Sequence, residues 1–434
     1  MQKIVMQGLG QNSAGHLTVG GASVPELARH YGTPLYILDE GVIRRNCREI
    51  LSGLREGYKA PFTVAFASKA LCFTQLYGLL REEGMGADVV SGGELYTALK
   101  GGFRPSDIFF HGNNKTAAEL EYALDAGVRR IVVDNAEELE LLSAIAARRG
   151  AVPEISFRIK PGIDAHTHEF IATGKIDSKF GLALETGEAA EVIARAASLK
   201  TLRVVGIHCH IGSQIFGTEP FEHAAKVMLT FMRDMREKPG APLNELNLGG
   251  GFGIRYLPSH DPVTLADMSL KCAESVTAAA NELGLPLPEL VLEPGRSITG
   301  PAGLTVYTVG SVKKIPDVNT YVAVDGGMTD NPRCALYGAY YEPIAPERPD
   351  APVTQTAVIA GRCCESGDVI TREAPLCDVR AGDLLAVQAT GAYNYSMASN
   401  YNRLPRPPIV MVRDGAVRLA VRRETYGDLL ACDQ

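Results

Sequence analysis

The sequence lacks three features, and each absence excludes a class of protein. It has no run of about 20 apolar residues that could span a membrane, and its first residues are too polar for a signal peptide. Its nine cysteines, an odd number, show no disulfide spacing. Its 43 basic residues do not exceed its 50 acidic ones, which argues against nucleic acid as a partner. We therefore expect a cytoplasmic protein with reduced thiols and no membrane or nucleic-acid partner.

What the sequence does contain is enough apolar material for two folded domains. The chain has 434 residues, of which 46% are hydrophobic and 21% charged, as in soluble globular proteins. From residue 36 to 300, short apolar runs alternate with helix-like stretches, which is typical of repeated βα units. Eight such runs predict a (β/α)₈ barrel of the TIM type. The runs are residues 62–67, 85–90, 107–111, 130–134, 154–160, 203–210, 245–248 and 290–293.

A different pattern follows residue 300. Strand-like runs occur there without long helices, and they predict an all-β C-terminal domain, a sandwich or a small barrel. These runs are residues 305–312, 320–324, 356–359, 383–389 and 408–422. One short run near the N-terminus, residues 17–19, also reads as a strand. We therefore expect residues 1–35 and 301–434 to form the β domain.

Polar residues follow the apolar runs at the end of the barrel where active sites lie. Lys69 follows the first run, and a lysine desolvated there would form an imine with an aldehyde, although most such lysines are surface charges. The glycines of residues 249–253 could bring backbone N–H groups close to a phosphate, or could simply form a tight turn. Glu293 could pair with a protonated pyridine nitrogen, or could merely end its strand. His210 could lie flat on an aromatic ring, or could be a core histidine. Together these residues match one cofactor, pyridoxal 5'-phosphate (PLP).

Nine sequence blocks carry a family resemblance over nearly the whole chain. They are FASKA around Lys69, DVVSGGEL at 88, HGNNK at 111, IDSKFG at 176, HCHIGSQ at 208, NLGGGFG at 247, EPGR at 293, CESGD at 364 and GAYNYSMASNYN at 391. With these blocks the chain resembles the barrel-type PLP-dependent decarboxylases, and within them the branch that acts on diaminopimelate. One departure is Phe66, where the family often has tyrosine; it should not affect imine formation.

The resemblance implies a role for each matching residue. Lys69 would be the Schiff-base lysine, His210 would stack on the cofactor ring, and Glu293 would face the pyridine nitrogen. The other cofactor-binding residues would be Asp88, Arg158, Ser213, Gly250, Gly251, Gly253, Gly295, Arg296 and Tyr393. The family is a homodimer with active sites shared across the interface, so Cys364 and Glu365 would reach into the partner's barrel.

The resemblance also implies the reaction. Cys364 would return a proton after loss of carbon dioxide, since a suitably placed thiol can act as a general acid; an isolated cysteine would more often be a buried apolar residue. Arginine binds carboxylates in a fork, so Arg296 and Arg333, with Tyr337 and Tyr393, would hold a distal carboxylate, and Glu365 the distal amine. A substrate with both groups is meso-diaminopimelate, whose decarboxylation to L-lysine is the last step of lysine biosynthesis.

Three alternatives remain open. A decarboxylase of the same fold could act on D-lysine, D-ornithine, carboxynorspermidine or carrier-bound glutamate. A PLP-fold protein without activity would be expected to have lost Lys69, Cys364 or Arg333. A metal-dependent barrel hydrolase is suggested by the pairs at 166 and 168 and at 208 and 210, but no carboxylate ligand is evident beside them in the sequence, so no metal is expected. Residues 164–178 are predicted to form a lid over the site.

Overall fold

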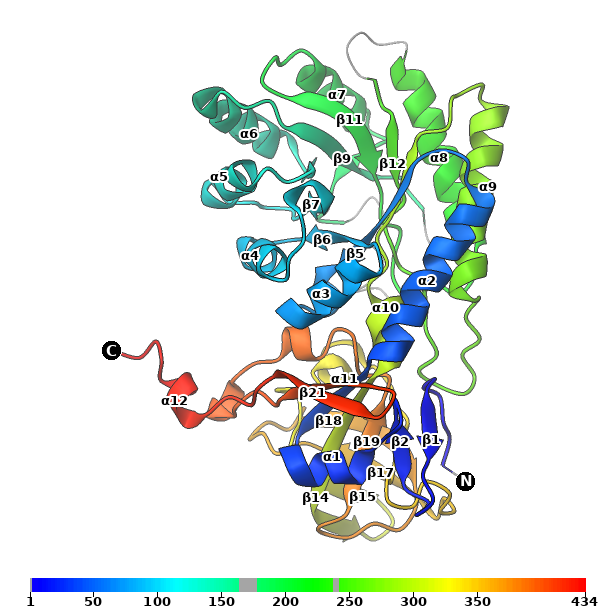
Figure 1. Ribbon diagram of the computed structural model, residues 1–434, viewed down its shortest axis with the longest axis vertical. Coiled ribbons are helices and arrows are strands. Elements are labelled where there is room, and N and C mark those ends of the chain that lie inside the picture. Colours follow the sequence, from blue (N-terminus) through cyan, green and yellow to red (C-terminus); the bar gives the residue numbers. More distant parts are fainter. Residues whose placement is uncertain (1, 164–177, 237–241) are drawn as a thin grey trace. The chain divides into compact units, whose positions relative to one another are not determined.

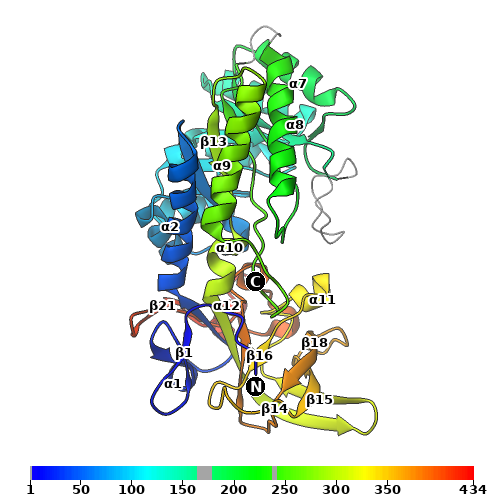
Figure 2. The same cartoon turned by 90° about the vertical axis from the view of Figure 1, so that its right-hand side faces the viewer.

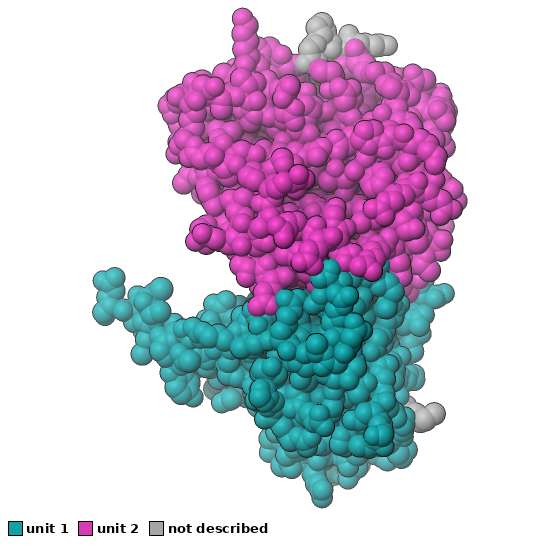
Figure 3. Space-filling view, in the orientation of Figure 1, with its two compact units in different colours: residues 1–45, 254–261, 296–434 teal, residues 46–253, 262–295 magenta. Residues whose placement is uncertain are grey.

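The computed structural model describes residues 2–163, 178–236 and 242–434, and the chain divides into two compact units (Figure 3). The first, called the β unit, comprises Met1–Arg45, Ile254–Asp261 and Arg296–Gln434. The second, called the barrel unit, comprises Asn46–Gly253 and Pro262–Gly295. Among the helices that the structure describes, none has both the length and the apolar character needed to cross a membrane. The predicted lid falls almost wholly on 164–177, outside the described residues.

Eight parallel strands close into the predicted barrel (Figure 1). Each strand pairs with the next along the chain, and the last, β13, pairs with the first, β5. The eight sequence runs are therefore confirmed as strands. A short additional strand, β10 (Leu182–Ala183), pairs with β9 and had not been predicted. The barrel strands are β5 (Phe62–Ala67), β6 (Gly86–Val89), β7 (Ile108–Phe110), β8 (Arg130–Val133), β9 (Glu154–Lys160), β11 (Arg203–His208), β12 (Glu245–Asn247) and β13 (Glu289–Leu292).

Helices alternate with the strands, and local sequence signals set their ends. Helix α5 begins at a capping box in which Thr116 and Glu119 bond each other's backbone N–H groups, and it ends at Gly127 in the left-handed conformation. Helices α2 and α9 lie side by side (Figure 2), because Gly53 has no side chain to collide with Ala266. The helices are α2 (Glu40–Gly57), α3 (Thr74–Glu82), α4 (Gly92–Lys100), α5 (Ala117–Ala126), α6 (Ala136–Arg149), α7 (Glu188–Ala197), α8 (Glu219–Arg236) and α9 (Leu265–Glu282).

The amino ends of the barrel strands carry a buried charge network. Arg130, at the start of β8, donates to both carboxylate oxygens of Glu245 at 2.6–3.2 Å, and it also donates to Glu154. The Arg130 and Glu245 side chains are 5% and 3% exposed. A buried pair of this kind contributes to stability mainly because either charge alone would be costly. This network therefore lies at the end of the barrel opposite to the carboxyl ends of the strands, where active sites of such barrels are found.

The β unit is built around one long antiparallel strand, β14 (Gly303–Ile315). Its sheet runs in the order β18, β17, β15, β14, β4, β20, β21, with β19 paired to β14 and β16. Two apolar clusters pack against these strands, and the second includes Leu17 and Val19 from the N-terminal segment. The strands are β1 (Leu9–Gln11), β2 (Leu17–Val19), β3 (Ala22–Ser23), β4 (Leu35–Asp39), β14, β15 (Asn319–Val324), β16 (Pro343–Ile344), β17 (Gln355–Ala360), β18 (Val369–Leu376), β19 (Leu384–Gln388), β20 (Ile409–Arg413) and β21 (Ala416–Val421); the helices are α1 (Val24–Tyr31), α10 (Arg296–Thr299), α11 (Arg333–Tyr337) and α12 (Tyr426–Leu429).

The β unit departs from the prediction at its borders with the barrel. Strand β4, predicted within the barrel domain that starts at residue 36, pairs instead with β14 and β20 of the β unit. The segment Ile254–Asp261, predicted within the barrel, also belongs to the β unit. Strand β18 was not predicted. All five residues of β4 are buried, and a fully buried run carries no periodicity that tells one sheet from another.

Candidate functional site

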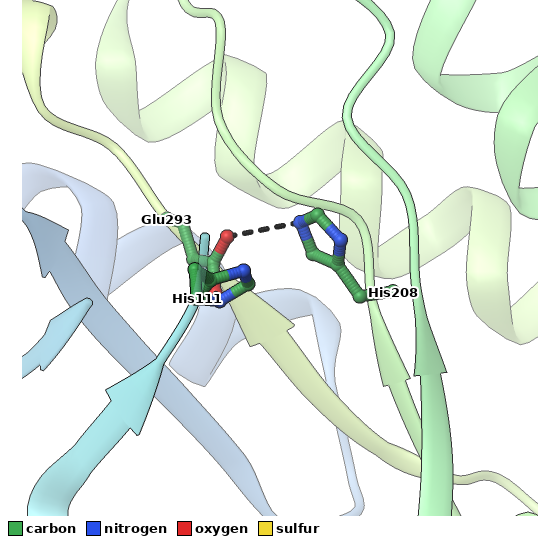
Figure 4. A group of neighbouring side chains, drawn as sticks. All are labelled: His111, His208 and Glu293. Carbon is green, nitrogen blue, oxygen red and sulfur yellow. Dashed lines mark hydrogen bonds and ion pairs between the residues drawn. The ribbon is translucent and has the colours of Figure 1, made fainter. Parts of the chain in front are cut away.

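Three buried side chains meet at the carboxyl ends of the barrel strands. Glu293 follows β13, His208 ends β11 and His111 follows β7 (Figure 4). His111 Nε2 lies 2.7 Å from Glu293 Oε1, and His208 Nε2 lies 3.1 Å from Glu293 Oε2. Asn247, at the end of β12, donates from Nδ2 to Glu293 Oε1 at 2.6 Å. Four strands thus fix one carboxylate at this end of the barrel.

The charges of this cluster follow from its burial and its contacts. Burial opposes ionisation of Glu293, but His111 and His208 hold its pKa well below its usual range. Burial lowers the pKa of His208 to about 3, so this ring is neutral. Burial also opposes a charge on His111, but the carboxylates of Glu293 and Asp88 raise its pKa. Glu293 is therefore a buried anion that can pair with a cationic group of a ligand.

Lys69 lies at the same end of the barrel, in a single turn (Ser68–Ala70) directly after β5. Burial raises the pKa of Asp88 and lowers that of His210 well below its usual range. The charge of Lys69 counters the first shift and adds to the second, so the amine lies within electrostatic reach of both groups. Lys69 is exposed in the single chain. The sequence predicts that the barrel shields the Lys69 side chain from solvent. In the single chain it does not, because Lys69 lies in the turn after β5 and not on the strand itself.

The glycine run forms a cradle that side chains would fill. The Gly250 N–H donates to His210 Nδ1 at 3.3 Å. A Cβ at Gly250 would lie 2.1 Å from the carbonyl oxygen of Glu293, and one at Gly251 would lie 2.3 Å from that of Gly212. Gly251 also has a φ of +111°, which other residues rarely adopt. Only glycine therefore allows this close backbone approach beside His210.

The remaining predicted residues of the barrel unit occupy neighbouring strand ends. Arg158, on β9, stacks its guanidinium 4.2 Å from the centre of the Phe180 ring, and burial lowers its pKa. Ser213 is partly buried in the loop after β11. A Cβ at Gly253 would meet Phe216 and Ile215, and one at Gly295 would lie 2.9–3.0 Å from the alanines beside Lys69. These side chains and glycines lie at or just after the carboxyl ends of barrel strands, as predicted.

In the β unit, two of the predicted arginines lie among tyrosines. Arg296, in α10, donates from Nη1 to the Tyr256 hydroxyl at 2.7 Å, and its guanidinium lies 4.7 Å from the centre of the Tyr393 ring. Arg333, in α11, donates from Nη1 to the Tyr341 hydroxyl at 2.7 Å. Tyr337 ends α11 and is partly buried. Tyr256 and Tyr341 were not predicted, because tyrosines with ordinary spacing carry no signal that distinguishes a site from a core.

Side-chain oxygens of Asp368 and Asn402 fix the loop that carries Cys364 and Glu365 through hydrogen bonds to its backbone. The buried carboxylate of Asp368 accepts from the backbone N–H groups of Cys363 at 2.7 Å and of Met328 at 2.6 Å. The N–H of Cys364 donates to Asn402 Oδ1 at 2.7 Å. Both Cys364 and Glu365 are exposed in the single chain. The predicted alternative of a buried apolar cysteine is therefore wrong for Cys364, although it describes Cys363, which is buried.

The cluster of Figure 4 also bears on the metal alternative. Among the described residues, His111, His208 and Glu293 form the one group of three that could hold an ion. The sequence predicts no carboxylate ligand beside His208, and it pairs His208 with His210. Both points are wrong: Glu293 contacts His208, while His210 faces the glycine run. Positions 166 and 168 lie outside the described residues.

The donor set fits one type of cofactor. Lys69 offers an amine that can bond an aldehyde, Glu293 an anion for a protonated ring nitrogen, and Gly250 and Gly251 a backbone that no side chain covers, of the kind that can approach a phosphate. An aldehyde, a protonated ring nitrogen and a phosphate anion are the functional groups of PLP. The barrel and this site define a PLP-dependent decarboxylase, and the pyridoxal-binding domain of the pyridoxal-dependent decarboxylases matches residues 40–300.

Comparisons with individual proteins narrow this class. The chain is 46% identical over 424 residues to the diaminopimelate decarboxylase of Bacillus subtilis, covering 98% of this chain and 96% of that protein. It is 44% identical to that of Mycobacterium tuberculosis (strain H37Rv), with the same coverage. The crystal structure of diaminopimelate decarboxylase from M. jannaschii in co-complex with L-lysine matches with a TM-score of 0.90 and 36% identity, over 99% of this chain and 98% of that one. The chain belongs to the diaminopimelate decarboxylase family.

Proposed function

We propose that the protein removes one carboxylate of meso-diaminopimelate as carbon dioxide and releases L-lysine, the last step of lysine biosynthesis. Arg333 carries the proposal. Its side chain is buried, and in the described part of the chain its partners are tyrosines and no carboxylate. A buried guanidinium without an anion is costly, so the anion is expected from a ligand. The carboxylate far from the reacting carbon of diaminopimelate would supply it.

The far end of the substrate would meet groups of both signs. Arg296, Arg333 and Tyr337 would hold the distal carboxylate, with Tyr393 beside them, and Glu365 would hold the distal ammonium group. A substrate without the distal carboxylate, such as D-lysine or D-ornithine, would bring no anion to Arg333. Loss of a charged partner in a buried site is discriminated strongly. Charge complementarity thus favours diaminopimelate over these amino acids.

The barrel unit would hold the cofactor through Lys69. Bound PLP supplies an electron sink that takes up the electron pair left by the departing carboxylate. Glu293, kept anionic by His111 and His208, would face the ring nitrogen. Neutral His210 would lie on the ring face. The remaining cofactor contacts would come from Asp88, Arg158, Ser213, Gly250, Gly251, Gly253, Gly295, Arg296 and Tyr393.

Cys364 would return the proton to the carbon that loses carbon dioxide. Its thiol is exposed in the single chain, as a group that must reach a substrate should be. The neighbouring Cys363 offers a contrast, because burial and Asp368 raise its pKa to about 11. That thiol is therefore a poor proton donor near neutral pH. We therefore predict that replacing Cys364 removes the return of the proton, and that replacing Cys363 does not.

A homodimer would complete each site. Lys69, Cys364 and Glu365 are all exposed in the single chain, and a second copy would cover them if Cys364 and Glu365 entered the partner's barrel. Mixing inactive Lys69→Ala and Cys364→Ala variants should then restore about a quarter of the wild-type activity, because one site of each mixed dimer is intact. Recovery of no activity after mixing would exclude shared sites. All nine cysteines are free, which supports the cytoplasmic location proposed for this reaction.

A substrate panel tests the proposed reaction. Carbon dioxide release would be measured with meso-diaminopimelate, D-lysine, D-ornithine and carboxynorspermidine, and the amine product would be identified by chromatography. We expect diaminopimelate to have the highest kcat/KM and L-lysine to be its product. The Arg333→Met variant should lose most of this preference, because it keeps the side-chain bulk and removes the charge. A wild-type preference for ornithine would overturn the proposal.

A further inference from the structure

Tyr256 lies where the chain leaves the glycine run. It belongs to the segment Ile254–Asp261, which follows Gly253 and is part of the β unit. Its side chain is 5% exposed, although the segment has no helix or strand of its own. A buried tyrosine normally places its hydroxyl on a polar partner. The identity of that partner indicates what the residue does.

Two guanidinium groups converge on Tyr256. Arg296, from α10, donates to the Tyr256 hydroxyl at 2.7 Å. Arg333, from α11, places its guanidinium carbon 4.9 Å from the centre of the Tyr256 ring, within the range of a cation–π contact. The Tyr341 ring meets the Tyr256 ring edge-on at 5.6 Å between ring centres, and its hydroxyl accepts from Arg333. Tyr256 therefore contacts both guanidiniums: its hydroxyl accepts from Arg296, and its ring lies beneath Arg333 and, at 5.8 Å, Arg296.

Two cationic side chains, Arg296 and Arg333, lie next to Tyr256. Burial opposes ionisation of its hydroxyl, but the two arginines lower its pKa below the usual value. In the chain as described, Arg333 has no carboxylate partner, and its Nε is buried without a hydrogen-bond partner. Two like charges repel, and long side chains lose rotamer freedom when they are fixed. Contacts with neighbouring side chains are therefore needed to fix the two guanidiniums before an anion binds.

We infer that Tyr256 is a positioning residue for substrate selection: its hydroxyl and ring set Arg296 and Arg333 in the orientation that binds the distal carboxylate. The inference rests on the proposed function of these arginines. Tyr256 itself need not touch the substrate. A preorganised pair of guanidiniums binds a carboxylate more tightly, because less side-chain freedom is lost on binding.

Two ligands separate this role from a general structural one. L-Lysine keeps the ammonium and the carboxylate of the substrate's far end, whereas cadaverine lacks the carboxylate. Their dissociation constants would be measured on the PLP-loaded enzyme by calorimetry. In Tyr256→Phe the ring remains and the hydroxyl is lost. We expect L-lysine to bind about tenfold more weakly, as for loss of a charged hydrogen bond, and cadaverine to bind as in the wild type. KM for diaminopimelate should rise by a similar factor with kcat nearly unchanged.

Controls make the outcomes distinct. Tyr58→Phe also removes a buried tyrosine hydroxyl, which donates to the Pro288 carbonyl at 2.6 Å in the barrel unit, and it should leave both affinities unchanged. Equal losses for L-lysine and cadaverine in Tyr256→Phe, or no loss for L-lysine, would overturn the inference. If Arg333→Met weakens L-lysine alone while Tyr256→Phe does not, the inference fails and the proposed function stands. If Arg333→Met affects neither ligand, both fail.

Discussion

The glycine cradle gives the sharpest prediction from geometry, through the variant Gly250→Ala. The added Cβ would lie 2.1 Å from the Glu293 carbonyl oxygen and 2.8 Å from its carbon, whereas ordinary contacts begin at 3.4 Å. The oxygen is therefore 1.3 Å too close, and one backbone must move. The adjacent link, from the Glu293 N–H to the Gly249 carbonyl at 2.7 Å, would move with it. Overpacking of this kind costs about 1–3 kcal/mol. The shift would also displace the Glu293 carboxylate from the position in which we propose that it faces the cofactor ring.

We expect the variant to bind PLP at least ~10-fold more weakly, a change of about 1.4 kcal/mol, and to unfold at lower urea. Apoenzyme would be titrated with PLP and followed by visible absorbance. Gly78→Ala is the matched control, because its Cβ would meet nothing closer than 3.8 Å and it lies within α3. That change should stabilise the helix by about 0.5–1 kcal/mol and leave PLP affinity unchanged. If both variants bind PLP equally well, the cradle argument is wrong.

Three further predictions concern buried charges. Arg130→Met should cost about 3 kcal/mol in urea unfolding, because it strands Glu245 without its partner; a loss below 1 kcal/mol would contradict this. Burial raises the pKa of Asp330 to about 7, so its contribution to stability is full below pH 4 and is lost as pH rises through 7. Asp330→Asn should therefore reduce the loss of stability between pH 5 and 8 by on the order of 2 kcal/mol, and equal pH slopes would refute it. Asp368→Asn removes one acceptor from the Cys363 N–H and should lower kcat about tenfold with PLP affinity unchanged; a weakened affinity for PLP would show that the effect is not local.

The barrel could be predicted because its signals are local. Each of the eight strands is a short apolar run between helix-like segments, and helix ends carry readable caps such as Thr116 and Gly127. The sheet that receives β4 could not be predicted, because Leu35–Asp39 is buried throughout and its partners lie more than 260 residues away. Strand β18 was missed because Arg372 and Glu373 interrupt its apolar run. Pairing between distant strands is a tertiary property.

Site residues could be predicted where a chemically reactive or conformationally special residue type directly follows an apolar run. Lys69, Glu293 and the glycine run follow apolar runs, and a parallel barrel brings strand ends together wherever they fall in the sequence. Asn247 could have been found by the same rule, since it ends β12 and lies one residue before the end of the predicted run 245–248. Tyr256 could not, because its segment leaves the barrel fold and meets arginines that are 40 and 77 residues further along the chain. Contacts of this kind depend on how the β unit packs.

The most direct test of the account is the covalent attachment of the cofactor. Purified holoenzyme would be reduced with borohydride, digested and analysed by mass spectrometry, with Lys69→Ala and Lys115→Ala treated in parallel. Lys115 is a buried lysine engaged by Glu138 and two backbone carbonyls, and it should remain unmodified. We predict one pyridoxyl group on Nζ of Lys69, and none in the Lys69→Ala variant. A pyridoxyl group on another lysine, or on none, would contradict the central claim.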